Sequence, residues 1–152
     1  MMEKKLILPN SILLGEVNEL LGEGKSVILM TKGSSMLPFI RGDKDSVELV
    51  RRDSVEVGDI ALVRLSNGAY VLHRVVGVSG KITLKGDGNL DNTESCPPES
   101  VCGVAVRILR PDGRSLDCTS ASFRRWSRRW RESPRFVRRY CLAVYRRLRK
   151  LI

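Results

Sequence analysis

Histidine, aromatic residues and long apolar runs are all scarce in this chain of 152 residues. His73 is the only histidine, and aromatic residues make up 5% of the sequence. Val, Ile and Leu must therefore fill the core, and a single domain of this length is large enough to bury one. No run of about 18 apolar residues occurs, so the sequence predicts no membrane-spanning helix.

The cysteines offer no obvious metal site. None of the four forms a C-x-x-C pair, and one histidine cannot complete the usual zinc patterns. We therefore expect reduced thiols, no metal and no cofactor, as is typical of a cytoplasmic protein.

Positive charge is concentrated at the C-terminal end. Residues 1–120 carry 15 Lys and Arg against 16 Asp and Glu, whereas residues 121–152 carry 12 basic residues and one acidic residue, Glu132. A neutral body with a cationic tail indicates a surface partner of opposite charge, either anionic lipid or nucleic acid.

Short apolar runs separated by turn signals cover the middle of the chain. A helix is expected from Asn10 or Ser11 to about Leu21, because apolar residues recur there on one helical face. The dipeptide Asn67-Gly68 predicts a hairpin. The expected strands are 26–31, a run through Val47, Leu49, Val55 and Val57, and then 60–65, 70–78, 82–84 and 101–109, with a turn-rich stretch over 86–98.

This spacing favours a mainly β domain with a twisted antiparallel sheet, a short N-terminal helix and a helical tail. In the tail, Phe123, Trp126 and Trp130 recur at helical spacing, Pro134 interrupts, and a second apolar repeat runs from Val137. We expect one kinked helix or two short amphipathic ones. The predicted division is a lead-in and helix over 1–24, a β domain over 25–118 and a basic helical tail over 119–152.

A serine turn and the single histidine are the strongest candidates for chemistry. The turn is Gly33-Ser34-Ser35-Met36-Leu37-Pro38. A serine hydroxyl needs a base to act as a nucleophile, and only His73 could be a histidine base. A carboxylate would orient the imidazole, and the turn over 85–91 supplies Asp87 and Asp91. Each motif also has a purely structural interpretation, as a turn or as a half-exposed strand residue.

Together these motifs resemble the type I signal peptidase and LexA-like serine peptidase superfamily. The resemblance covers about residues 25–109. It rests on the serine turn and on Gly58-Asp59-Ile60, His73-Arg74-Val75-Val76-Gly77 and Lys85-Gly86-Asp87-Gly88-Asn89. It implies a mostly β catalytic domain that cleaves a peptide bond by acyl transfer, with Ser35 as nucleophile and His73 as general base.

Histidine at the base position is similar to the endoplasmic-reticulum, archaeal and sporulating-bacterium branch, whereas LexA and bacterial leader peptidases have lysine there. By the same resemblance, Asp87 is the expected orienter of His73 and Asp91 is its rival. Gly33 stands where many signal peptidases have a serine that helps hold the oxyanion. The oxyanion hole would therefore rest on backbone N–H groups, that of Ser35 first, with Ser34 as a helper.

We expect no membrane-spanning anchor of the kind the family has, and the amphipathic tail could replace it at an anionic membrane surface. The residues expected to do so are Trp126, Trp130, Arg124, Arg128, Arg138 and Arg146. We expect a serine endopeptidase that acts on a peptide or protein in the cytoplasm, peripheral on the inner face of the membrane. The alternative is an inactive β module that binds peptide, anionic membrane or, less favoured, nucleic acid through its tail. For the tail itself, docking on the β body by its apolar stripe, or binding of a protein partner, is the other interpretation.

Overall fold

A computed structural model describes the backbone of residues 10–151 and the side chains of residues 13–148. The part of the expected lead-in before Asn10, and the last residue of the expected tail, lie outside the described residues.

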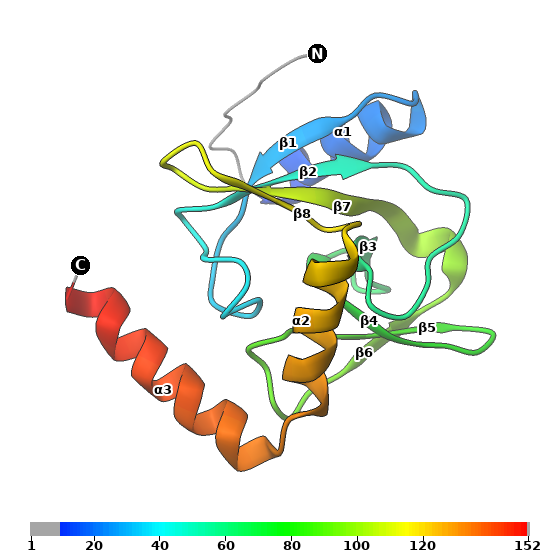
Figure 1. Ribbon diagram of the computed structural model, residues 1–152. Helices are drawn as coiled ribbons and strands as arrows, with labels where there is room; N and C mark the ends of the chain where they lie inside the picture. The colour runs from blue at the N-terminus through cyan, green and yellow to red at the C-terminus, as the bar shows by residue number, and fades with distance from the viewer. Residues whose placement is uncertain (1–9, 152) are drawn as a thin grey trace.

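The strands form one antiparallel sheet in the order β1-β2-β7-β3-β4-β5-β6, with β8 paired to β7 (Figure 1). Their bounds are β1 (Val27–Met30), β2 (Ser46–Val50), β3 (Ile60–Arg64), β4 (Tyr70–Val78), β5 (Ile82–Lys85), β6 (Glu94–Cys96), β7 (Val101–Leu109) and β8 (Ser115–Asp117), with a short 3-10 helix η1 (Pro98–Ser100) before β7. The helices are α1 (Asn10–Gly22), α2 (Ala121–Glu132) and α3 (Arg135–Leu151). This arrangement confirms the expected mainly β fold with an N-terminal helix and a helical tail.

Two short strands were not expected from the sequence, and one expected run is not a strand. Strands β6 and β8 have three residues each, too few for alternation to be recognised. The run through Val55 and Val57 is a loop in which Val57 is exposed. The tail forms two helices that are separated at Pro134, which is the second of the two arrangements expected from the sequence.

The β3–β4 hairpin fixes the position of His73. Its turn contains Asn67 and Gly68, and Gly68 has φ +86°, which glycine adopts without strain. The resulting register pairs His73 with Ala61, the second residue of β3. His73 is therefore buried within the sheet, not at its exposed rim.

The core consists of two apolar clusters. The larger contains residues of α1, of the β1–β2 loop and of the sheet, and it includes Phe123 of α2. The smaller consists of aliphatic residues of β3, β4, β5 and β7 together with Cys96 of β6. Because Phe123 belongs to the larger cluster, α2 is packed on the body. In Figure 1, α3 follows α2 and runs diagonally outside the sheet.

The loop between β1 and β2 carries the serine turn, and Asp45 holds its base together. The Thr31 hydroxyl donates to the Asp45 carbonyl at 2.8 Å, and the Asp45 carboxylate accepts hydrogen bonds from Arg41 and Arg110. Burial alone would raise the pKa of Asp45, but the hydrogen bonds and charges of these two arginines outweigh it and lower that pKa. The carboxylate is therefore ionised at neutral pH and can hold both guanidinium groups.

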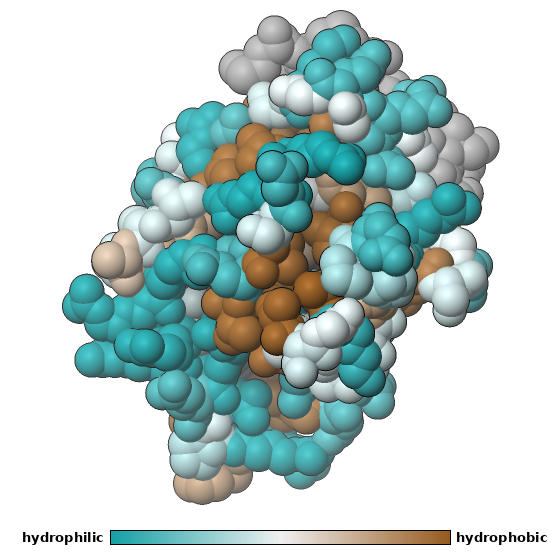
Figure 2. Space-filling model, turned by 90° about the vertical axis from the view of Figure 1, so that its right-hand side faces the viewer, coloured by the Kyte–Doolittle hydropathy of each residue, from teal (hydrophilic) through white to brown (hydrophobic). Residues whose placement is uncertain are grey.

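Figure 2 shows the face of the molecule that lies on the right in Figure 1, where brown apolar side chains gather at the centre inside a frame of hydrophilic ones. Within the described residues, no helix combines the length and the apolar character needed to cross a lipid bilayer.

Candidate active site

The serine turn depends on a close backbone approach at two glycines. Gly33 has φ +79°, in the left-handed region. A Cβ on Gly42 would lie only 1.9 Å from the carbonyl oxygen of Gly33, so only glycine fits at position 42. The turn is closed by a hydrogen bond from the Leu37 N–H to the Ser34 carbonyl at 3.2 Å.

The glycine-aspartate turn over 86–88 packs directly on Ser35. The Gly88 N–H donates to the Ser35 carbonyl at 2.8 Å. A Cβ on Gly86 would lie 2.4 Å from that same carbonyl oxygen and 3.2 Å from the Ser35 Cβ. Two motifs that are 50 residues apart in the sequence therefore meet through their backbones at the candidate nucleophile.

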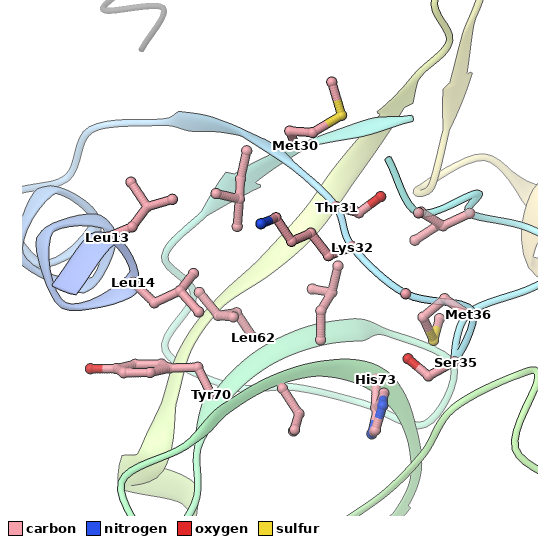
Figure 3. A pocket seen from close by; sticks show the side chains of 16 residues that line it. Leu13, Leu14, Met30, Thr31, Lys32, Ser35, Met36, Leu62, Tyr70 and His73 are labelled. Carbon is pink, nitrogen blue, oxygen red and sulfur yellow. The ribbon is translucent and has the colours of Figure 1, made fainter. Parts of the chain in front are cut away.

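Ser35 and His73 line one pocket of about 240 Å³. Figure 3 shows the Ser35 hydroxyl beside the His73 ring at one end, with Leu13, Leu14 and Tyr70 at the other. The rest of the lining is mostly apolar and comes from β1, the serine turn and the β3–β4 hairpin. It includes Leu29, Met30, Met36, Ile40, Leu62, Val71 and Leu72, and Lys32 also lines the pocket. Such a pocket suits an apolar side chain next to a reacting group.

The carboxylate next to His73 is that of Glu94, on β6. Its Oε1 lies in contact with the imidazole Nδ1, although the two atoms do not form a well-aligned hydrogen bond, and its Oε2 has no hydrogen-bond partner among the described residues. The register of the strands explains why Glu94 lies beside His73. Glu94 pairs with Leu84, Leu84 pairs with Val75, and Val75 and His73 are two apart on β4, so all four share one face.

The expectation that Asp87 orients His73 is wrong. The Asp87 carboxylate is bound by the Arg74 guanidinium, at 2.6 Å to Nη2 and 3.2 Å to Nε. Successive strand residues point to opposite faces of a sheet, so Arg74, which holds this carboxylate, leaves β4 on the side opposite His73. Asp91 does not take the role either, because its exposed carboxylate pairs with Arg135 of α3.

The Arg74–Asp87 pair is buried and fully surrounded. Both side chains are 1% exposed, and Arg74 also donates to the Gly58 carbonyl at 2.9 Å. The guanidinium carbon lies 5.4 Å from the ring centre of Phe39 and 5.7 Å from that of Phe123, within the range of cation–π attraction. The pair joins β4 to the turn that holds Ser35.

Several tail residues expected at a membrane are used to dock α2 on the body. The Trp130 indole N–H donates to the Asp87 carbonyl at 2.9 Å. Arg124 binds Asp59, and Trp126 packs on Phe39 with ring centres 4.6 Å apart, although half of its surface stays exposed. Among the other expected tail residues, Arg128 and Arg146 are exposed and Arg138 is half-buried.

The thiols are free, and three of the four are buried. Burial raises the pKa of Cys118 to about 12 and also raises the pKa of Cys96 and of Cys102, so these three stay protonated at neutral pH. Across the part of the chain that the structure describes, no three His, Cys, Asp or Glu side chains are grouped as a metal site would need.

Sequence reasoning missed Glu94 because it lies in a three-residue strand inside a turn-rich stretch. The alternation that places it on the His73 face becomes visible only when the β5–β6 pairing is known. Neither a scan against protein-family models nor a search of curated proteins finds a match for this chain.

Asp87 and Asp91 give a matched test of the buried pair. We expect Asp87→Asn to lower the free energy of unfolding by about 3–5 kcal/mol, since it leaves the Arg74 charge buried without a partner. Asp91→Asn removes an exposed ion pair and should cost less than about 1 kcal/mol. Denaturant unfolding of both variants measures the difference, and equally small losses would contradict the structural role assigned to Asp87.

Proposed function

We propose that this protein is a serine endopeptidase of the signal peptidase-like type, with a signal-peptidase/LexA-like β domain. The observation that supports it best is the position of Ser35 and His73 at the same end of an apolar pocket, with a carboxylate on the far ring nitrogen of His73. Acyl transfer by serine requires a nucleophile, a base that takes its proton, and a carboxylate that orients the base.

Each group has a defined role in the proposed reaction. His73 Nε2 takes the Ser35 Oγ proton as Oγ attacks the substrate carbonyl, and the imidazolium then gives that proton to the leaving amine. Water, activated by the same imidazole, hydrolyses the resulting ester. Glu94 stabilises the imidazolium from the Nδ1 side, and the Ser35 N–H, beside Ser34 and Gly33, donates to the oxyanion.

The first test is covalent labelling of Ser35. A fluorophosphonate probe should label the wild-type protein, and Ser35→Ala should abolish labelling because the attacking oxygen is gone. His73→Ala should reduce the rates of labelling and of peptide cleavage by about 10³- to 10⁴-fold. Ser66→Ala, in the exposed β3–β4 turn, is the control and should behave like wild type.

Labelling that persists in Ser35→Ala would refute the assignment of the nucleophile. A wild-type protein that binds peptides in the pocket but is never labelled would instead be the inactive β module.

Glu94→Gln tests the orienting carboxylate. The amide keeps the size of the side chain but cannot stabilise the imidazolium, so kcat should fall by about 10²- to 10⁴-fold with little change in KM. Glu94→Asp, which keeps the charge on a shorter side chain, should recover part of the lost rate. Glu99→Gln, an exposed change a few residues away, is the control. Full activity of Glu94→Gln would show that His73 works without this partner.

We also propose that α3 attaches the protein to an anionic membrane surface. Phe136, Tyr140 and Leu148 are 73%, 72% and 54% exposed, and they recur every four or eight residues along one helical stripe. No acidic residue occurs after Glu132, so the charged side chains that α3 itself places beside this stripe are all basic. An apolar stripe beside cationic side chains is typical of helices that lie in the headgroup layer.

Vesicle sedimentation tests this attachment. The protein should bind vesicles that contain anionic lipid more strongly than neutral ones, and Phe136→Ser with Tyr140→Ser should weaken that binding at least severalfold through the lost apolar area. Val57→Ser with Val78→Ser removes exposed apolar side chains elsewhere and should have no effect. Binding to DNA with a steep salt dependence, in the absence of vesicle binding, would point to nucleic acid instead.

A further inference from the structure

A second cleft borders Ser35. It has an open volume of about 630 Å³ and shares Gly33 and Ser35 with the apolar pocket, but its other walls come from different elements. One wall is the loop after β5, with Gly88, Asn89, Leu90 and Asp91. The other is α3, with Arg135, Arg139, Leu142 and Arg146. Ser35 therefore stands between an apolar pocket and a cleft lined by arginines.

The spacing along α3 explains why its arginines reach this cleft. Residues 135, 139, 142 and 146 are separated by steps of four and three, so they lie on one helical face. Leu142 is buried on this face and anchors the helix against the body. The exposed stripe of Phe136 and Tyr140 lies to another side, so membrane attachment and this cleft use different surfaces of α3.

The cleft keeps an excess of positive charge. Arg135 is paired with the Asp91 carboxylate, which is the only acidic side chain that lines the cleft. Within the described residues, Arg139 and Arg146 have no acidic partner. Two guanidinium groups beside the candidate nucleophile are thus available for an external carboxylate, which guanidinium binds well through paired N–H donors.

We infer that this cleft binds an acidic segment of the peptide substrate. The inference rests on the proposed peptidase function and adds a substrate class to it. An apolar side chain next to the cleaved bond fills the pocket, and Asp or Glu residues on the opposite side of that bond bind Arg139 and Arg146. An extended peptide rises about 3.3 Å per residue, so carboxylates two to four residues from the bond reach well into a cleft that begins at Ser35.

The test measures binding apart from cleavage. Fluorescent peptides of equal length are titrated into the Ser35→Ala protein. Each peptide has one apolar residue, and the residues that follow it are acidic (Asp and Glu), neutral (Ser and Gln) or basic (Lys). In a second set of peptides, the same acidic, neutral or basic residues precede the apolar residue. On one of the two sides, acidic peptides should bind about two- to tenfold more tightly than neutral ones, the range that two exposed ion pairs support. This preference should fade at about 0.5 M salt.

Charge reversal provides the matched comparison. Arg139→Glu with Arg146→Glu should reverse the preference in favour of the Lys peptides. Arg125→Glu with Arg147→Glu makes the same change in net charge at exposed positions that do not line the cleft, and it should leave the preference intact. Thermal melting should show that both double variants stay folded.

Equal affinity for acidic and neutral peptides would overturn the inference, as would an equal effect of the two double variants, since the attraction would then come from overall charge. Cleavage is followed separately with the Ser35-bearing protein. A retained charge preference without cleavage would refute the peptidase proposal while leaving an acid-binding cleft, whereas cleavage without a charge preference would refute the cleft alone.

Discussion

The buried ion pair between Arg74 and Asp87 determines how the candidate site is assembled. Arg74 follows His73 on β4, and Asp87 lies in the turn whose Gly88 N–H holds the Ser35 carbonyl at 2.8 Å. This side-chain contact and the Gly88–Ser35 backbone hydrogen bond together join the strand of the base to the loop of the nucleophile. Because neighbouring residues of β4 point to opposite faces, Arg74 leaves the strand on the side opposite His73, and this contact does not use the imidazole.

The Arg74–Asp87 pair matters more for the placement of the elements around the site than for the free energy of folding. Removing two charges from water costs free energy that their attraction repays only when the geometry is good and other groups complete the hydrogen bonding. Here the Gly58 carbonyl accepts from Arg74, two aromatic rings lie against the guanidinium, and the Trp130 indole binds the backbone of Asp87. Helix α2 contributes Trp130 and one of the rings, so the first half of the tail completes the shell around this pair.

The sequence allows the local structure of the site to be predicted, but not its cross-strand partners. Strands 70–78 and 101–109 were predicted with the bounds that the structure shows, because apolar runs and turn residues mark both of their ends. Glu94 could not be assigned, since its approach to His73 depends on two strand pairings that leave no periodic signal in a three-residue strand. Asp87 was misassigned because a glycine-aspartate turn near a histidine does not reveal on which face of the sheet its carboxylate lies.

The tail shows a related limit of sequence reasoning, because net charge does not say which arginines are available to a partner. Arg124 is committed to Asp59, and Arg135 to Asp91. Arg139 and Arg146 lie in the cleft beside Ser35, so their positive charge is placed where a substrate would meet it. Amphipathic periodicity predicts both helices. It does not distinguish a helix whose apolar face packs on the body from one whose apolar face remains exposed. The difference follows from Phe123, which packs on Phe39, and from Trp130, which donates to the Asp87 carbonyl. Among the described side chains of α3, only Leu142 is buried.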